Sequence, residues 1–162
     1  MEKKAIQDYY PDDFAKCYGC GYLNEKGLKI KSYWDNKTES SVCSFDPAPY
    51  HTAIPGFVYG GLIASLIDCH GTGTAAAAGY KHEQRKLGTD PPIRYVTASL
   101  QVDYLKPTPI DTRLELRAEV KEVKGRRITV DVVLSANGEI CAKGTVICVR
   151  ITESMLPKSS GV

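Results

Sequence analysis

The stretch FVYGGLIASLIDCHGTGTAAAAGY, residues 57–80, decides the fold, because it is the one strong helix candidate in the chain. Its apolar side chains recur at spacings of one, three, four and five residues, and four alanines close the segment before Gly79. A helix that is apolar on almost every side must be buried. The apolar positions that set this pattern are Leu62, Ile63, Leu66 and Ile67.

The residues after the helix change from a helical period to a period of two. The segment 93–105 (IRYVTASLQVDYL) alternates an apolar set with Thr97, Ser99, Gln101 and Asp103. Such alternation is typical of a strand with one apolar and one polar face. Turns are expected at Lys124-Gly125 and at Asn137-Gly138, the latter a strong type I′ hairpin signal. Four consecutive antiparallel strands are therefore predicted. The last of them is expected over residues 140–151. The apolar positions of the first three are Val96, Ala98, Leu100, Val102 and Tyr104; Leu114, Leu116, Ala118 and Val120; and Ile128, Val130, Val132 and Leu134.

The residues before the helix predict a hairpin followed by an irregular loop. The segments 27–35 (GLKIKSYWD) and 39–45 (ESSVCSF) have strand character and flank a turn at 35–37 (DNK). Prolines 47, 49 and 55 exclude regular structure from residues 46–56. We expect residues 1–26 to form an N-terminal extension, 27–152 the folded domain and 153–162 a flexible tail, with residues 1–16 fraying like the tail.

These elements predict an α+β fold in which one long central helix is wrapped by a single curved antiparallel sheet of about six strands. One helix cannot cover six strands on both faces, so the outer face is left polar or used for assembly. An open edge strand leaves backbone groups that can pair with another chain. The helix is wholly apolar and has a glycine-rich start. Both features favour pairing of two copies.

Composition excludes several classes of protein. The chain has 162 residues, and 21 Lys+Arg against 19 Asp+Glu gives 21 − 19 = +2. Its basic residues are spread along the chain, which argues against nucleic acid as the main partner. The apolar runs are shorter than the roughly 20 residues of a membrane span. The first residues lack the apolar run of a signal peptide, so we expect a cytoplasmic protein. Cysteines 43, 69, 141 and 148 lie among apolar neighbours, as free thiols do.

Three residues of the helix suggest chemistry. Gly60 and Gly61 open the helix, where backbone N–H groups have no intrahelical partner and can hold a carbonyl oxygen that gains negative charge. Asp68 follows Gly60 by eight residues, or about 12 Å at 1.5 Å per residue. That distance is too long for both to serve one atom within one subunit. A second chain should therefore supply the partner of each group.

The chain resembles the hotdog-fold acyl-CoA thioesterases, particularly the phenylacetyl-CoA and hydroxybenzoyl-CoA thioesterases. The resemblance rests on 17–21 (CYGCG) with Asn24 and 27–28 (GL), on 55–61 (PGFVYGG) leading into 66–68 (LID), and on 96–100 (VTASL) with 104–107 (YLKP). It covers most of the chain, and the middle block is the most specific.

The resemblance implies hydrolysis of an acyl-CoA thioester to the acid and CoA by a homodimer, or a dimer of dimers. The helices of two subunits would lie antiparallel, with the Gly60 amide of one facing the Asp68 carboxylate of the other. Asp68 would be the general base or the nucleophile. Thr97 stands where relatives carry a residue that orients water or the carboxylate, although its pattern equally suits the polar face of a strand. We place Phe57, Val58, Tyr59 and Gly61 at the substrate.

One departure from the family leaves two other functions open. Tyr59 replaces the histidine that many relatives carry before the glycine pair, and a phenol cannot replace an imidazole at neutral pH. The chain could instead be an acyl-CoA-binding module with little turnover. A hotdog enoyl-CoA hydratase or dehydratase would need a histidine with an acid. His70 lies about 200° round the helix from Asp68, and His51 lies in the proline-rich loop.

The remaining candidates concern charge and metal. CoA carries phosphates, and Arg94 and Lys106 are proposed to bind them, with Lys81, Arg85 and Lys86 as further cations near the loop 80–92. That loop is expected to cover the acyl channel. Cys17 and Cys20 have the spacing of half a zinc site, but no second pair with metal spacing follows. The sequence therefore predicts no metal and no cofactor.

Overall fold

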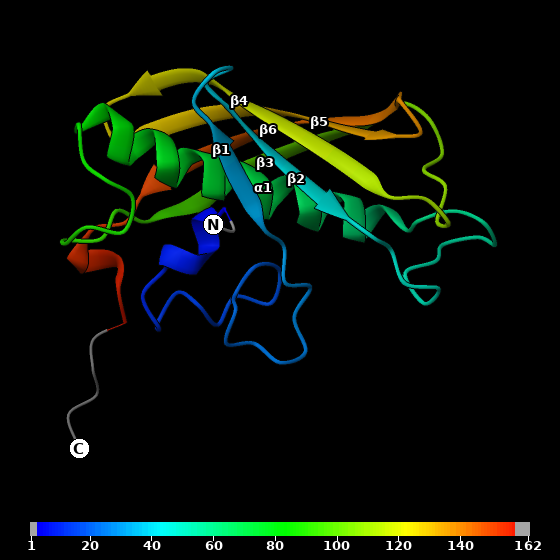
Figure 1. Cartoon of the computed structure of the whole chain (residues 1–162), viewed down its shortest axis with the longest axis horizontal. Helices are drawn as coiled ribbons and strands as arrows, with labels where there is room; N and C mark the ends of the chain where they lie inside the picture. Colours follow the sequence, from blue (N-terminus) through cyan, green and yellow to red (C-terminus); the bar gives the residue numbers. More distant parts are fainter. Residues whose placement is uncertain (1–2, 158–162) are drawn as a thin grey trace.

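A computed structural model describes residues 3–157 and has one long helix against one six-stranded sheet (Figure 1). The sheet lies on one side of helix α1, and the N-terminal segment lies on the other side. The elements in chain order are η1 (Ile6–Tyr9), β1 (Ser32–Asp35), β2 (Ser40–Phe45), α1 (Gly60–His82), β3 (Tyr95–Tyr104), β4 (Leu114–Lys124), β5 (Arg127–Ala136), β6 (Glu139–Arg150) and η2 (Glu153–Met155).

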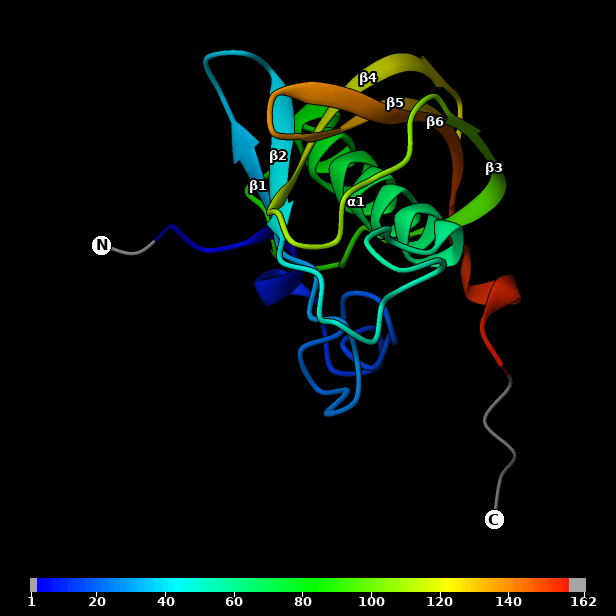
Figure 2. The same ribbon diagram turned by 90° about the vertical axis from the view of Figure 1, so that its right-hand side faces the viewer.

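The sheet is antiparallel throughout and has the strand order β1-β2-β4-β5-β6-β3. The view along the helix shows the strands curling around it, with β1 and β3 at the two edges (Figure 2). The predicted turns are present, since Gly125, Asn137 and Gly138 all have positive φ. The predicted α+β hotdog fold is confirmed.

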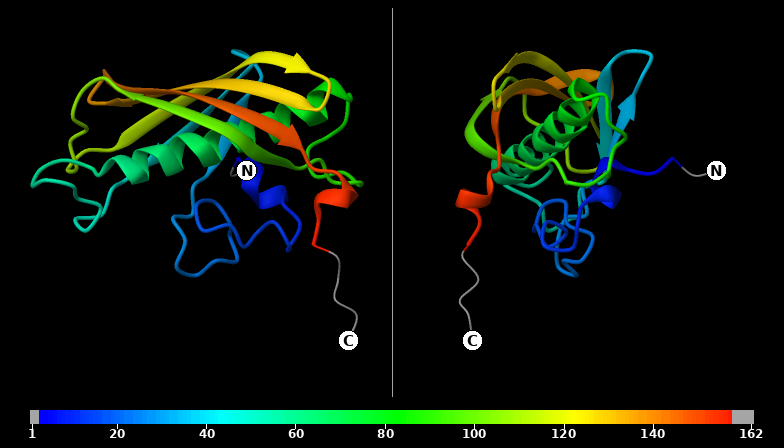
Figure 3. Two further views of the ribbon diagram at one scale, coloured as in Figure 1. Left: turned by 180° about the vertical axis from the view of Figure 1, so that it is seen from behind. Right: turned by 90° about the vertical axis from the view of Figure 1, so that its left-hand side faces the viewer.

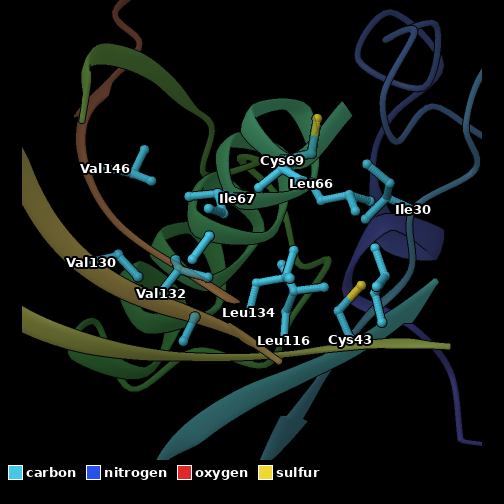
Figure 4. Close-up of a cluster of buried hydrophobic side chains, with 14 of the residues drawn as sticks. Ile30, Cys43, Leu66, Ile67, Cys69, Leu116, Val130, Val132, Leu134 and Val146 are labelled. Carbon is cyan, nitrogen blue, oxygen red and sulfur yellow. The ribbon is translucent and has the colours of Figure 1, made fainter. Parts of the chain in front are cut away.

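The core lies between α1 and the inner face of β4, β5 and β6. The alternation predicted for β4 and β5 is confirmed, because all the predicted apolar positions except the half-buried Val120 are buried and the intervening charged residues of β4 are exposed. Leu66 and Ile67 of α1 are fully buried, and Figure 4 shows the side chain of Ile67 between the helix and the strand residues Val132 and Val146. Packing of this kind contributes about 1.5–3 kcal/mol for each large apolar side chain.

Strand β3 departs from strict alternation at a register shift after Thr97. Residues paired directly across an antiparallel ladder share a face. Thr97 pairs with the buried Cys148 and Leu100 pairs with the buried Val146, so both face the helix although they are three residues apart. The bulge adds one residue and reverses the faces. The prediction that Val96 shares the inner face with Leu100 is wrong.

The other consequence of this edge position is exposed apolar surface. Leu100 is 38% exposed and Tyr104 is 53% exposed, although both belong to the inner set of the strand. No strand of the described residues pairs with the outer edge of β3. This edge therefore keeps unpaired backbone groups beside apolar side chains.

The helix begins at Gly60, where the glycine pair is predicted to open it, and ends at His82 instead of at residue 80. Residues 57–59 are extended, because Val58 forms a bridge with Thr52 and Phe57 forms one with Pro109. The helix continues to His82, so residues 81 and 82 do not belong to the loop. Basic residues in a last turn favour this extension, because the helix macrodipole is negative there.

The N-terminal segment is ordered, which corrects the expectation that residues 1–16 fray; residues 1–2 lie outside the described part. Ala5, Ile6 and Gln7 are buried, and η1 packs against β1 and α1. Figure 3 shows this segment on the side of the helix that faces away from the sheet.

The predicted strand 27–35 is also shorter than expected, because β1 begins only at Ser32. The backbone N–H groups of Leu28 and Ile30 donate to the carbonyls of Tyr18 and Gly19 instead of to a strand. At the other end, the predicted tail begins with the short helix η2, and residues 158–162 lie outside the described range. Among the residues described, no helix has the length and apolar character needed to cross a membrane.

Candidate active site

Two cavities adjoin α1 at different points along its length. The aspartate cavity has a volume of about 230 Å³ and adjoins the middle and the C-terminal half of the helix. The glycine cavity has a volume of about 380 Å³ and adjoins the N-terminus of the helix. The walls of the aspartate cavity include Tyr10, Phe14, Asp68, Tyr80, Arg94 and Thr97, and those of the glycine cavity include Phe57, Val58, Gly60, Ile63, Tyr104 and Lys106.

Asp68 is half-buried on the face of α1 that borders β3. Thr97 Oγ1 donates a hydrogen bond to Asp68 Oδ1. Burial raises the pKa of the Asp68 carboxyl, the hydrogen bond from Thr97 lowers it, and the nearby Cys17 raises it further. The net direction is upward, which makes the carboxylate a better proton acceptor than an exposed aspartate.

Thr97 reaches Asp68 because of the bulge in β3. The sequence pattern grouped Thr97 with Ser99 on the polar face of the strand, whereas the pairing with Cys148 turns its side chain toward the helix. The hydroxyl can therefore fix the orientation of the carboxylate. This contact agrees with the role that the family resemblance implies for Thr97.

The glycine pair lies between two tyrosine rings. A Cβ on Gly60 would lie 3.2 Å from the hydroxyl of Tyr104, and a Cβ on Gly61 would lie 2.3 Å from the ring of Tyr59. Tyr104 also donates a hydrogen bond of 2.7 Å to the carbonyl of Gly60. The N-cap residue Tyr59 makes no side-chain hydrogen bond to the helix. The first N–H groups of the helix therefore stay free of a side-chain cap, as an oxyanion site requires.

The predicted substrate residues at this end surround the glycine pair. Phe57 and Val58 line the glycine cavity, and Tyr59 is 45% exposed beside it. The ring of Tyr59 occupies the space that a side chain at Gly61 would need. All four of these residues therefore lie at the helix N-terminus, and none of them lines the aspartate cavity.

The two proposed phosphate-binding cations border different cavities. Arg94 lines the aspartate cavity, where Nη1 lies 2.8 Å from Asp13 Oδ2 and the guanidinium lies 4.3 Å from the centre of the Phe14 ring. Its Nε is buried without a partner among the described residues. Lys106 lines the glycine cavity and pairs with Glu139 at 3.3 Å.

The other three cations have different surroundings. Lys81 pairs with Glu39 and lies over Trp34, on the far side of the helix from the aspartate cavity. Arg85 donates hydrogen bonds to the carbonyls of Thr89 and Pro91, and these bonds stabilise the loop. Lys86 is exposed. The loop itself contributes Leu87 and Pro92 to the aspartate cavity.

Neither candidate histidine lies in a cavity wall. His70 is fully buried, with Nδ1 2.8 Å from Ser32 Oγ, so it faces β1 and not Asp68, as the helical angle predicts. His51 accepts a hydrogen bond of 2.9 Å from the amide of Ala48. Burial lowers the pKa of both imidazoles. Neither cavity wall therefore contains a histidine that could take part in the hydration of an enoyl-CoA.

Sequence reasoning missed several residues of these cavities. Tyr104 was assigned only as an apolar strand position, yet its hydroxyl binds the first turn of the helix. Tyr10 and Phe14 line the aspartate cavity from a segment that was expected to fray. Cys69 lies with Cys17 and Cys20, and the three sulfurs are all within 4.8 Å of one another. The aromatic residues in 9–14 (YYPDDF) were the available signal.

Asp68 and Gly60 do not meet within one chain. They are eight residues apart on one helix, about 12 Å along its axis, and they line different cavities. Each cavity therefore contains only one of these two groups.

Comparison with known proteins identifies the family. Residues 55–142 match the sequence profile of the Thioesterase superfamily, and this range contains Gly60, Asp68 and Thr97. The chain belongs to the thioesterase superfamily. The matched range runs from the proline-glycine entry of the helix to the middle of β6, which is the central part of the fold.

Individual relatives agree with this assignment. The crystal structure of a thioesterase superfamily protein from Shewanella loihica PV-4 is 44% identical, covers 90% of this chain and 99% of its own, and has a TM-score of 0.67. A phenylacetic acid degradation-related protein from Ralstonia eutropha, 19% identical with a TM-score of 0.63, covers 75% of this chain and 85% of its own, and shares the fold.

A curated relative carries an activity in its name. Acyl-coenzyme A thioesterase THEM4 of Xenopus laevis is 31% identical over 102 residues, which are 63% of this chain and 40% of that protein. The chain spans less than half the length of the curated relatives it matches.

Proposed function

We propose that this protein hydrolyses an acyl-CoA thioester to the free acid and CoA. The observation that carries the proposal is Asp68, a half-buried carboxylate held by Thr97 in a cavity of a thioesterase superfamily chain. A carboxylate in such surroundings is costly unless it has a functional role or a strong partner. The name of the THEM4 relative supports acyl-CoA as the substrate class.

In the proposed reaction, Asp68 takes a proton from water that attacks the thioester carbonyl, or attacks that carbonyl itself. Thr97 donates to Oδ1 and leaves Oδ2 free for either step. The carbonyl oxygen becomes negative and accepts hydrogen bonds from the N–H groups at the helix N-terminus. The carbon–sulfur bond then breaks, and the CoA thiolate leaves and takes up a proton. On the route in which Asp68 attacks, this step leaves a mixed anhydride on Asp68, which water hydrolyses to the free acid and the Asp68 carboxylate.

The proposed active site needs two copies of the chain. The separation of Asp68 and Gly60 along α1 prevents both from acting on one carbonyl in one subunit. Two features support a homodimer, namely the open edge of β3 and the exposed apolar residues Leu100 and Tyr104 on it. Antiparallel helices would place the glycine cavity of one subunit against the aspartate cavity of the other. A dimer of dimers is the larger assembly that the same edge and the outer face of the sheet permit.

The two ends of the substrate can be assigned to different walls. We assign the acyl group to the aspartate cavity, whose walls include Tyr10, Phe14 and Tyr80, because aromatic and apolar side chains suit an acyl chain. We assign the phosphates of CoA to Arg94 and Lys106, one beside each cavity. Tyr59 and Phe57 would contact the thioester end.

The test is thiol release from short, medium, long and aromatic acyl-CoAs, followed with a thiol-reactive chromogen. Wild type should release CoA from at least one of them, and Asp68→Asn should not. A wild type that binds CoA esters but releases no thiol would instead indicate a binding module, with Tyr59 as the reason. Hydration of an enoyl-CoA without thiol release would indicate a hydratase.

A further inference from the structure

Three cysteine sulfurs from two distant parts of the chain meet beside Asp68. Cys17 and Cys20 come from the N-terminal extension, and Cys69 comes from the middle of α1. The sulfurs of Cys17 and Cys69 are 4.0 Å apart, and all three lie within 4.8 Å of one another. A tetrahedral zinc ion with Zn–S bonds of 2.3 Å separates its sulfur ligands by about 3.8 Å. The three thiols are therefore close to the spacing of a shared ion.

The backbone around the three thiols is shaped for this approach. A Cβ on Gly19 would lie 2.3 Å from the sulfur of Cys69, so only glycine lets that thiol reach the turn. A Cβ on Gly21 would lie 2.2 Å from the carbonyl of Ala15, which keeps the turn tight. The amide of Gly21 also donates a hydrogen bond of 2.8 Å to the carbonyl of Cys17. Both glycines of the CYGCG motif thus serve the geometry of the cluster.

The surroundings of the cluster favour a cation. Figure 4 shows the Cys69 sulfur pointing away from the strand residues of the core, toward the side of the helix where the N-terminal segment runs. Cys17, Cys20, Cys69 and the carboxylate of Asp68 all line the aspartate cavity. Soft thiolate ligands select zinc over magnesium or calcium.

We propose that Cys17, Cys20 and Cys69 bind a zinc ion that fastens the N-terminal extension to α1. Binding of the ion displaces the protons of the three thiols into solvent, and the three thiolates coordinate it. The fourth ligand is a water molecule in the aspartate cavity. The ion holds in place the segment that carries Tyr10 and Phe14, two walls of that cavity. The proposal does not depend on the reaction proposed above.

The test uses the full chain, freed of metal with a chelator under reducing conditions and titrated with Co²⁺. Wild type should bind one ion per chain and develop the thiolate-to-cobalt charge-transfer absorption and the d–d bands of a tetrahedral site. Excess Zn²⁺ should abolish both. Cys17→Ser and Cys69→Ser should weaken the charge-transfer absorption, whereas Cys43→Ala, a buried cysteine outside the cluster, should leave it unchanged.

Limited proteolysis gives a readout that does not depend on the variants. Wild type stripped of metal should be cut within residues 3–31 faster than the same protein with Zn²⁺. The proposal is overturned if wild type develops no cobalt bands, if the charge-transfer absorption of Cys69→Ser is as strong as that of wild type, or if mass spectrometry finds a disulfide between two of the three cysteines in metal-free protein purified under non-oxidising conditions.

Discussion

The glycine cavity and the aspartate cavity belong to the same helix but use different physical means. At the helix N-terminus the functional groups are backbone amides, kept accessible by glycine and flanked by the rings of Tyr59 and Tyr104. At the middle of the helix they are side chains, namely a half-buried carboxylate, a threonine and three thiols. One cavity can bind developing negative charge, and the other can supply a base.

In the proposed active site, each chain would therefore contribute two unlike halves. Neither half contains what the other supplies, and the helix holds them apart. Changes at the aspartate cavity should therefore remove the base, while changes at the glycine cavity should remove only stabilisation of the oxyanion. Asp68→Asn, Gly60→Pro and Thr97→Val test this division, and a fourth substitution, at His70, tests how burial in the same helix affects stability. They are given in decreasing order of expected effect.

Asp68→Asn should have the largest effect. Asparagine keeps the size of the side chain and can still accept the hydrogen bond from Thr97, but it cannot accept a proton. We expect kcat/KM for thiol release to fall about 10³-fold, or about 4 kcal/mol, with little change in CoA ester binding. Asp103→Asn, at an exposed position of β3, is the matched control. Equal activity of Asp68→Asn and wild type would remove Asp68 from the chemistry.

Gly60→Pro should have the next largest effect. Proline is well tolerated at the first position of a helix and removes one N–H, and the extended conformation of Tyr59 suits a following proline. We expect kcat to fall about 10²-fold, the cost of losing one oxyanion donor. Gly60→Ala is the control, because it adds a Cβ beside Tyr104 but keeps the N–H. If the alanine variant is as slow as the proline variant, the loss of activity comes from the added side-chain atoms and not from the missing N–H group.

His70, which is buried on the helix, should make the free energy of unfolding of the protein depend on pH. Desolvation lowers its pKa from 6.5 to about 4. Above pH 6.5 the imidazole is neutral in both states and the pH has no effect through it. As the pH falls from 6.5 toward 4, only the unfolded state takes up the proton, so stability is lost.

At pH 5 this loss should be about 2 kcal/mol in the free energy of unfolding. Urea unfolding at pH 7 and pH 5 measures it. His70→Asn, whose side chain can still bond Ser32, should be less stable at both values but should show a smaller difference between them. An unchanged difference would assign the pH dependence to other groups.

Thr97→Val should have the smallest effect of the four. Valine keeps the shape but removes the donor to Asp68, and the pKa of Asp68 then rises further because that hydrogen bond lowers it. We expect about a tenfold loss in kcat/KM, or about 1.4 kcal/mol. Thr97→Ser keeps the hydroxyl and should retain most of the activity. A serine variant as slow as the valine variant would show that packing, and not the hydrogen bond, matters.

Much of the fold could be predicted because it follows from local patterns. The apolar stretch around Leu66 indicated a buried helix, alternation indicated β4 and β5, and Asn137-Gly138 marked a hairpin. Strand β3 was one exception. Its bulge is a property of its pairing with β6, and the sequence of one strand does not contain that pairing. The face of Val96 was consequently assigned wrongly.

The sequence predicts the main residues of the candidate site but not the residues from distant segments that pack around them. Gly60 and Asp68 carry their chemistry in residue type and spacing. The cluster around Cys69 could not be predicted, because its first two members are about fifty residues away along the chain. Tyr10 was missed for the same reason, because the aromatic residues of the N-terminal stretch do not by themselves indicate that the stretch packs against the helix. Contacts between distant segments depend on the folded chain.

The central claim is that one active site takes Asp68 from one subunit and the Gly60 amide from the other. Two tagged heterodimers test it most directly, with thiol release as the readout. The first pairs Asp68→Asn with Gly60→Pro, and the second pairs wild type with the double variant. If the site is shared, the first heterodimer contains one intact site and should have about half the wild-type rate, whereas the second contains none and should be nearly inactive. The reverse result, an inactive first and a half-active second heterodimer, would place the whole site within one chain and contradict the account.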